Sequence, residues 1–259
     1  MKNATTTRFV VREPRNVEEL EALLRLRYSV FRAHEMGFIV RENEYGLDVD
    51  AWDKHAWHIG LYKQAKAECQ PIGYMRFIHN GPEYSSLVHE LGEKYADLGA
   101  IIVRQPPITH PFLGRCSPLL PPDLLTAFQS MTAGKLVEVS RFALLDTEKN
   151  PVVSRFMVES VTAIFHLCKK VDTLFEVAAH HAPFYQRYGY RPVAKYEYKE
   201  LPWETVLIHA HPSYMEREHQ PRIRHMADAF EETQEIWLHT DEPENYRPSA
   251  KHLSESNEA

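Results

Sequence analysis

The sequence predicts an α/β fold in which a mixed sheet is flanked by helices and one central strand carries a bulge. Strand-like and helix-like segments alternate along most of the 259 residues, which is typical of this fold class. The segment 135–145, KLVEVSRFALL, has the apolar character of a buried strand, yet it contains Glu138 and Arg141. Ionised groups are rarely buried without partners, so these two side chains need a structural or chemical reason to lie there.

A bulge in this central strand is expected because its two charged residues have the wrong spacing for one face. Glu138 and Arg141 are three positions apart, and strict strand alternation would send them to opposite faces. One extra residue near Val139 to Arg141 would turn both side chains to the same side of the sheet. The alternative, a plain ion pair at the end of a strand, stays open on these residues alone.

The N-terminal segment predicts a strand followed by a helix. Phe9 to Val11 is a short apolar run, and Asn16 with Glu19 resembles a capping box that starts a helix through about Arg32. Arg27 falls on the apolar stripe of this helix, so its guanidinium needs an anionic partner unless it snorkels to the surface.

A hairpin is expected next along the chain. Apolar residues alternate around 57–61 and again around 72–78, and the polar segment 64–70 joins the two strands. Arg76 shares a face with apolar residues of the second strand. It is therefore another charged residue on an apolar surface.

An acidic loop precedes the hairpin, within residues 36–53. Asp48, Asp50 and Asp53 follow two glutamates there, and such a run is usually a solvated loop. Interleaved aromatic residues favour a loop that packs against the fold, where carboxylates would suit a cationic ligand. These aromatic residues are Phe38, Tyr45 and Trp52.

The second half of the chain alternates again after a proline-rich stretch. Between 105 and 123 six prolines exclude a long regular element, so residues 81–134 are expected to form an irregular insertion on the surface. The elements expected after the central strand are a helix from Pro151, a strand at 174–178, a short helix ending at Gly189, and strands at 191–195 and 205–209.

We expect one domain over residues 1–210, including the insertion, and a C-terminal extension over 211–259. Within the extension, Met226 to Leu238 is expected to form a helix outside the core. The polar segment after His239 is expected to be disordered.

Composition limits the possible functions. The net charge of -6 and the lack of a long Lys and Arg run argue against nucleic acid and against anionic membrane surfaces. Three scattered cysteines give neither a disulfide framework nor a cysteine zinc site, and the histidines show no metal-binding spacing. No signal sequence and no membrane-spanning segment is evident, so we expect a cytoplasmic protein without a bound metal.

The charged residues form a pattern that resembles the acyl-homoserine-lactone synthase family, the bacterial autoinducer synthases. The shared features are Arg27-x-x-x-Phe31, Asp48-x-Asp50-x-x-Asp53, Arg76 in a G-x-x-R strand, and Glu138-x-x-Arg141 in VEVSRF. The segment FYQRYGY and the strand order are similar to the wider GCN5-related N-acetyltransferase fold. The resemblance spans roughly Phe9 to Lys195, and acyltransferases associated with exosortase systems and N-acyl amino acid synthases are similar in the same way.

The chain departs from that family in three places. The family has a tryptophan shortly after the position of Phe31 that contacts S-adenosylmethionine, and this chain has Gly37-Phe38 there. The stretch between Arg76 and Glu138 is longer than in the family. The tail beyond residue 210 is extra.

The resemblance implies transfer of a fatty acyl chain to the amine of a small amino-acid-type acceptor, either an amino acid or S-adenosylmethionine. Carboxylates bind the incoming ammonium and accept its proton, and arginines orient them or hold the acceptor's carboxylate. The residues expected to be catalytic are Glu138, Arg141 and Asp50. Those expected to bind substrate are Arg27, Phe31, Phe38, Asp48, Asp53, Arg76, Ser140 and Phe142.

We expect acyl carrier protein as the thioester donor. The segment after the central strand, LLDTEKNPVVSRF, lacks the glycine-containing loop with which this fold usually binds the pyrophosphate of coenzyme A. Arg155, Lys169 and Lys170 are the basic residues expected to dock the carrier protein. A backbone N–H at the bulge would stabilise the oxyanion, and no nucleophilic residue and no bound cofactor is required.

A different class of function remains as the alternative. The same fold could use its acidic loop to hold a cationic metabolite without chemistry, because fold resemblance alone does not establish activity. An assay of thioester consumption with Glu138→Gln beside the parent would separate the two.

Overall fold

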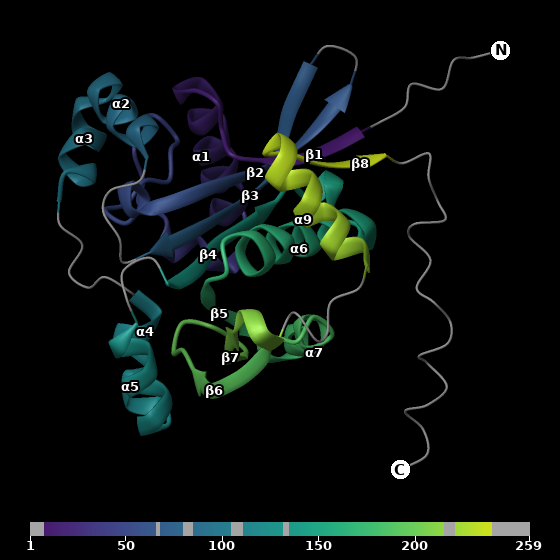
Figure 1. The fold of residues 1–259 in the computed structure, drawn as a ribbon. Helices are drawn as coiled ribbons and strands as arrows, with labels where there is room; N and C mark the ends of the chain where they lie inside the picture. The colour runs from purple at the N-terminus through teal and green to yellow at the C-terminus, as the bar shows by residue number, and fades with distance from the viewer. Residues whose placement is uncertain are drawn as a thin grey trace.

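The structure is a computed structural model that describes residues 8–65, 68–79, 85–104, 111–131, 135–214 and 221–239. These residues form a mixed eight-stranded sheet with the order β6-β7-β5-β4-β3-β2-β1-β8 (Figure 1). Strands β4 and β5 pair in parallel, whereas the other neighbours are antiparallel. The strands are β1 (Arg8–Arg12), β2 (Ala56–Ala65), β3 (Glu68–His79), β4 (Leu136–Leu144), β5 (Asp172–Ala178), β6 (Arg191–Glu197), β7 (Glu204–Ala210) and β8 (Ile236–His239).

Helices cover both faces of this sheet, as the predicted fold class requires. In Figure 1, α6 and α9 lie in front of the sheet and α1 lies behind it. The α-helices are α1 (Val17–Arg32), α2 (Ser86–Lys94), α3 (Ala96–Ile102), α4 (Pro111–Cys116), α5 (Pro122–Ser130), α6 (Pro151–Thr162), α7 (Ala182–Gln186) and α9 (Pro221–Thr233). The shorter turns are η1 (Glu35–Ile39), η2 (Asp53–His55), η3 (Ser117–Leu119), η4 (Asp146–Glu148), the π-helical η5 (Ala163–Cys168) and η6 (Ala179–His181).

Helix α1 forms where the capping pattern predicted it. The Asn16 side chain accepts a hydrogen bond from the backbone N–H of Glu19 at 2.9 Å, which satisfies one of the free amides of the first turn. The apolar stripe of the helix packs against β1, β2 and β3. Arg27 lies in that stripe and is fully buried, so the helix carries a charge into the interior.

The predicted hairpin is confirmed as β2 and β3, and both strands are longer than expected. The predicted bulge in β4 is also confirmed. Tyr74 pairs with Ala143 and Arg76 with Ser140, so Arg141 and Phe142 both lie opposite the single residue between the two β3 partners. The bulge places Arg141 in the left-handed region, with φ of 57°.

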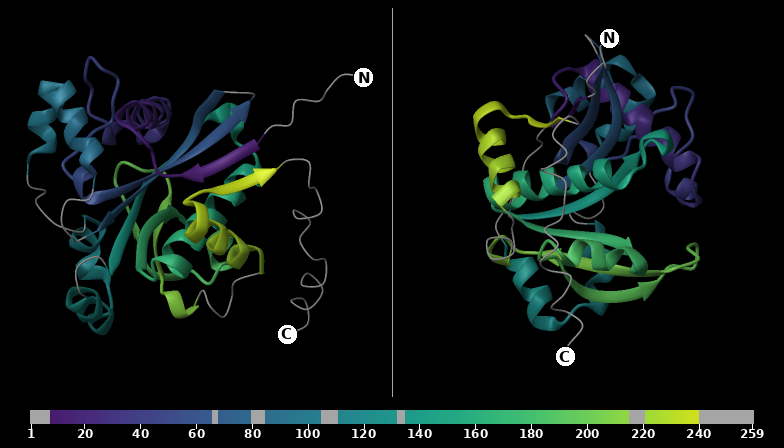
Figure 2. Two further views of the ribbon diagram at one scale, coloured as in Figure 1. Left: turned by 45° about the horizontal axis from the view of Figure 1, so that its top comes forward. Right: turned by 90° about the vertical axis from the view of Figure 1, so that its right-hand side faces the viewer.

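Strands β4 and β5 separate beside this bulge. They pair from Leu136 with Asp172 to Val139 with Phe175, and no further pair follows. Beyond Val139, β4 pairs only with β3, and beyond Phe175, β5 pairs only with β7. Figure 2, right, shows the two strands diverging. We call this feature the β4/β5 split.

Helix α6 and η5 pack on the face of the sheet opposite α1. Asn150 caps α6 by accepting from the N–H of Val153 at 2.9 Å, and Pro151 is the first helical residue. The stretch Pro151–Cys168 is long and apolar enough to cross a membrane by composition, but 67% of it is buried inside this fold. Such burial is typical of a core helix.

The insertion consists of short helices, in agreement with its prolines. Helices α2 and α3 pack near α1, and α4, η3 and α5 cover the β4, β5 and β7 face through a small apolar cluster. The longest of these helices has nine residues. Expected positions within 105–110 and 132–134 lie outside the described residues.

The expectation for Met226 to Leu238 is wrong. Helix α9 ends at Thr233, and the chain then forms β8, which pairs with β1 and extends the sheet. Gln234 has φ of 60°, which ends the helix by a turn that sequence periodicity does not reveal. Helix α9 packs in the main core rather than outside it. The domain boundary at residue 210 stays a prediction, and residues 240–259 lie outside the described part.

Candidate active site

Arg27 forms the buried centre of a charged network on the α1 face of the sheet. Its Nη1 and Nη2 atoms donate to the two carboxylate oxygens of Asp53 at 2.9 and 3.0 Å, and its Nε lies 2.8 Å from Asp48 Oδ2. Its Nη1 also donates to the hydroxyl of Tyr74 at 3.0 Å. The guanidinium therefore binds two aspartates of the acidic loop at once.

Arg76 on β3 connects the same loop to the bulged strand. Its Nη1 donates to Asp50 Oδ1 at 2.6 Å and to Asp53 Oδ1 at 2.9 Å, and its Nε donates to Ser140 Oγ at 3.0 Å. The N–H of Asp50 donates to Asp53 Oδ2 at 2.8 Å, so the loop is also held by its own backbone.

Arg141 joins the network because the bulge turns it to this face. Its Nε lies 3.2 Å from Asp48 Oδ2 and its Nη2 lies 3.6 Å from Asp50 Oδ2. Its Nη2 also donates to the carbonyl of Ile39 at 3.2 Å, and its guanidinium lies 5.6 Å from the centre of the Phe31 ring. Residues of α1, the acidic loop, β3 and β4 thus meet at one place.

The charges in this network balance, and burial and the neighbouring charges shift the pKa values of its members. Burial would raise the pKa of Asp53, but Arg27 and Arg76 outweigh it and hold that pKa below its usual range. Burial lowers the pKa of Arg141, and Asp48 only partly opposes this effect.

The network has two partly exposed members of opposite charge. Asp50 is 21% exposed and Arg141 is 15% exposed, whereas Arg27, Asp48 and Asp53 are buried. In this structure those three buried side chains do not reach the surface. The expected role of these three residues in binding substrate stays a prediction.

Glu138 lies on the same sheet face but contacts a different part of the molecule. It is buried, and its Oε1 accepts a hydrogen bond from the backbone N–H of Leu113 in α4 at 2.7 Å. Ser140 follows two residues later on the same face and binds Arg76. The bulge thus places Glu138 and Arg141 on one face, although no ion pair between them is observed among the described residues.

Two exposed aromatic residues are near the bulge along the chain: Phe142 is part of it, and Phe38 precedes Ile39, whose carbonyl accepts a hydrogen bond from Arg141. Phe38 in η1 is 56% exposed, and Phe142 at the bulge is 38% exposed. Trp203, in the loop between β6 and β7, lies with its ring centre 6.3 Å from that of His34, just after α1. This contact connects the two halves of the sheet across the β4/β5 split.

Sequence reasoning missed two neutral members of the network, His58 and Tyr74. Tyr74 Oη lies 2.7 Å from Nδ1 of His58 in addition to its contact with Arg27, and Nε2 of His58 lies 2.9 Å from the carbonyl of Asp53. Both residues occupy ordinary strand positions, so only the position of Tyr74 on the face of Arg76 hinted at a role.

Helix α6 begins beside the β4/β5 split without a phosphate-binding loop. The N–H of Val153 already donates to the Asn150 side chain, and Pro151 has no N–H. Arg155 donates to Glu159 at 2.7 Å, which leaves it only 23% exposed. Lys169 and Lys170 lie at the far end of this 18-residue helical stretch, about 27 Å from its start. Their expected role in docking the carrier protein stays a prediction.

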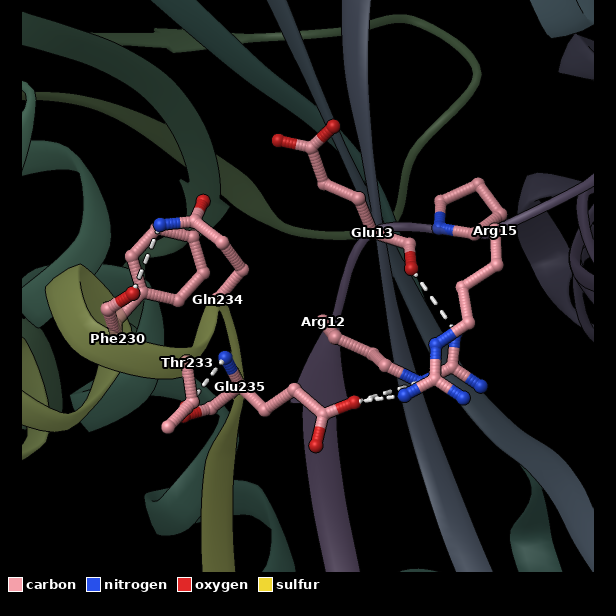
Figure 3. Close-up of a pocket in the computed structure, with 8 residues that line it drawn as sticks. Arg12, Glu13, Arg15, Phe230, Thr233, Gln234 and Glu235 are labelled. Carbon is pink, nitrogen blue, oxygen red and sulfur yellow. Dashed lines mark hydrogen bonds and ion pairs between the residues drawn. The ribbon is translucent and has the colours of Figure 1, made fainter.

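A separate cavity of about 320 Å³ lies where the segment after β1 meets the end of α9 (Figure 3). Its arginines are already bound: Arg12 pairs with Glu19 at 2.6 Å, and Arg15 pairs with Glu235. In the described ranges, no group of three or more histidine, cysteine, aspartate or glutamate side chains is arranged to hold a metal ion.

The fold is of the GCN5-related N-acetyltransferase type. Residues 26–103 match the acetyltransferase (GNAT) domain family, and this match contains Arg27, the acidic loop and Arg76. It covers fewer than a third of the chain and ends before β4. The match supports an acyltransferase. No curated protein sequence matches the chain.

Several solved structures are similar to this chain. The acyl-homoserine-lactone synthase LasI is 14% identical, with 80% of this chain and 89% of that chain covered and a TM-score of 0.50. FeeM, an N-acyl amino acid synthase from uncultured soil microbes, is 13% identical, with 81% and 95% covered and a TM-score of 0.49. BjaI, a coenzyme A-dependent acyl-homoserine-lactone synthase, is 16% identical, with 79% and 81% covered and a TM-score of 0.47. At these identities the likeness concerns the fold alone.

Proposed function

We propose that the protein is an N-acyltransferase that moves a fatty acyl chain from an acyl-carrier-protein thioester to the amine of a small amino-acid-type acceptor. The observation that carries this proposal is the β4/β5 split beside the bulge, where Glu138 and Arg141 share one face of the sheet. Beyond Val139, the β5-facing edge of β4 has no strand partner in the part of the chain that the structure describes. Its backbone groups are therefore available to bind an extended substrate arm and to stabilise an oxyanion.

The acceptor site is proposed at the exposed side of the charged network. An amino-acid acceptor carries an ammonium and a carboxylate, and Asp50 and Arg141 present one charge of each sign there. Phe38 and Phe142 provide apolar surface next to these two groups. S-adenosylmethionine and simple amino acids both have this chemistry, so the product is either an acyl-homoserine lactone or an N-acyl amino acid.

In the proposed reaction, Glu138 takes the proton of the acceptor ammonium, directly or through one water molecule. The neutral amine then attacks the thioester carbonyl, the C–N bond forms and the C–S bond breaks. The carrier thiolate takes the second proton, which the attacking nitrogen loses, and leaves as the thiol, while the first proton passes from Glu138 to water. The N–H of Leu113 orients the Glu138 carboxylate for this step.

The decisive experiment compares lipid extracts from cells that express the parent protein or Glu138→Gln, analysed by mass spectrometry. Glu197→Gln, an exposed position on β6, is the matched control. We expect a new N-acyl product with the parent and with the control but not with Glu138→Gln. Its head group identifies the acceptor. If the parent also gives no new N-acyl product under adequate expression and acyl supply, the non-catalytic binding module is favoured instead. The same product from the parent and from Glu138→Gln would contradict the role of Glu138 as base.

The choice of donor rests on the start of α6. Because Asn150 and Pro151 leave few free amides there, a pyrophosphate gains little, and acyl carrier protein is the proposed donor. Turnover of purified protein with acyl-carrier-protein and acyl-coenzyme A thioesters of equal chain length tests this. Equal or faster turnover with coenzyme A would overturn it.

A further inference from the structure

We infer that His58 and Tyr74 are positioning residues that fix Arg27 and Asp53. They do so through a series of hydrogen bonds in which the donor and the acceptor of each bond are determined. The two residues lie on neighbouring strands, β2 and β3, and both are buried. His58 is paired directly with Arg76 across the hairpin. They therefore stand beneath the charged network, between the strands and the acidic loop.

The order of protons follows from the chemistry of the partners. Nε2 of His58 lies 2.9 Å from the backbone carbonyl of Asp53, and a carbonyl only accepts, so Nε2 carries the hydrogen. In the neutral ring Nδ1 is then an acceptor, and the hydroxyl of Tyr74 at 2.7 Å must donate to it. The Tyr74 oxygen in turn accepts from Nη1 of Arg27 at 3.0 Å. Each hydrogen in this series of hydrogen bonds is therefore assigned to one atom.

These hydrogen bonds hold Asp53 by its side chain and by its backbone. Arg27 and Arg76 bind its carboxylate, while His58 binds its backbone carbonyl. Asp53 Oδ2 accepts from the N–H of Asp50, whose carboxylate is the exposed acid of the network. A shift of Asp53 would therefore move Asp50.

This series of hydrogen bonds requires a neutral His58 ring. Burial, together with the positive charges of Arg27 on α1 and Arg76 on β3, lowers the pKa of His58 to about 4 against the opposing effect of Asp53 in η2. A protonated ring would direct a second donor at the Tyr74 hydroxyl. The same burial raises the pKa of Tyr74, so its hydroxyl keeps the proton that it donates.

Nuclear magnetic resonance of the full chain labelled with 15N-histidine tests the proton order without any substrate. His58→Gln assigns the resonance, and we expect the tautomer protonated at Nε2, with no titration between pH 5.5 and 8. His166 is an internal reference, because its Nδ1 lies 3.2 Å from the carbonyl of Val171 and must carry the hydrogen there. A His58 ring protonated at Nδ1, or one that titrates near pH 6.5, would overturn the inference.

Kinetics tests the positioning role, and only this part rests on the proposed acyl transfer. Tyr74→Phe and His58→Gln should each raise the KM for the acceptor roughly tenfold while the KM for the acyl donor stays within about twofold. A role in packing alone would lower the yield of folded protein without changing the KM of the folded fraction. Tyr190→Phe, which removes a buried hydroxyl on the other side of the β4/β5 split, should leave the acceptor KM unchanged.

The two tests separate the possible failures. Unchanged acceptor KM values in both variants would overturn the positioning role even if the resonances show the expected tautomer. A parent protein without acyl transfer would contradict the proposed function, and the resonance data alone would then decide the order of protons.

Discussion

Different interactions stabilise the two halves of the sheet, which lie on either side of the β4/β5 split. On the β1 to β4 side, three arginines and three aspartates form one joined, buried network. On the β5 to β7 side the charged contacts are separate, as where Asp172 lies 2.7 Å from His209, and a neutral cluster lies in the core: Tyr190 Oη is 2.9 Å from Thr162 Oγ1 and 3.2 Å from His166 Nε2. Aromatic rings complete that side, as where Phe175 packs edge-on against Tyr190.

This difference indicates where the fold tolerates change. A buried ion pair loses much free energy when one partner is removed, because the remaining charge stays in the interior. A neutral hydrogen bond that is lost costs much less. We therefore expect substitutions to be tolerated least in the half that is proposed to hold the acceptor.

Asp53→Asn should have the largest effect on stability. It leaves Arg27 and Arg76 buried with one negative charge fewer, and we expect the free energy of unfolding to fall by about 3 to 5 kcal/mol. Urea unfolding followed by circular dichroism measures this. Asp146→Asn, which removes an exposed pair with Lys149, should stay within experimental error. A loss below about 1 kcal/mol for Asp53→Asn would contradict the importance of the charged network.

Each half also contains one buried histidine that resists protonation. Burial lowers the pKa of both His58 and His166 to about 4, below the value of about 6.5 of an unfolded chain. As the pH falls from 6.5 to 4, the unfolded chain gains a proton that the folded protein does not bind. The free energy of unfolding therefore decreases in this window, by up to about 3 kcal/mol for each histidine.

Unfolding titrations of the parent, His58→Gln and His166→Gln from pH 7 to pH 4 test this dependence. Each variant should lose part of the slope, because carboxylates that titrate in the same window are common to all three proteins. A parent-like slope in both variants would show that neither histidine contributes.

Tyr190→Phe should have a smaller effect. The change removes the hydroxyl that contacts Thr162 and His166 but keeps the ring packed against Phe175. We expect a loss of about 1 to 2 kcal/mol in the free energy of unfolding, measured in the same urea titrations. A loss as large as that of Asp53→Asn would remove the distinction between the two halves.

Removal of a helix cap should have the smallest effect on the free energy of unfolding, and the effect should be equal for the helices on the two faces of the sheet. Asn16 caps α1 and Asn150 caps α6 with the same geometry, each accepting at 2.9 Å from the residue three positions later. Either change to alanine should cost about 1 kcal/mol, because capping is local and independent of the buried network. Clearly unequal losses would indicate that one cap also supports its neighbouring site.

The charged half was largely predictable from sequence because charges on apolar patterns stand out. Arg27 on a helix stripe and Arg76 on a strand face each demanded a carboxylate, and the acidic loop supplied them. The odd spacing of Glu138 and Arg141 predicted the bulge, since no regular strand brings both to one face.

Neutral and backbone partners could not be predicted in this way. The N–H of Leu113 that binds Glu138 carries no sequence signal, because every residue except proline has one. His58 alternates like any strand residue, and its hydrogen bonds depend on three-dimensional contacts with β3 and η2. Strand β8 is only four residues long, and its pairing with β1 is a long-range contact that local periodicity does not encode.

The pairing of β8 with β1 also affects the order in which the chain can fold during its synthesis. Strand β1 is translated first, yet its outer edge is covered only by residues 236–239, more than 220 positions later. At translation rates of about 5 to 20 residues per second, that edge waits roughly 10 to 45 seconds for its partner. An uncovered strand edge is a template for pairing with other chains, so the nascent protein passes through an interval of exposure to misassembly that ends only with its last strand.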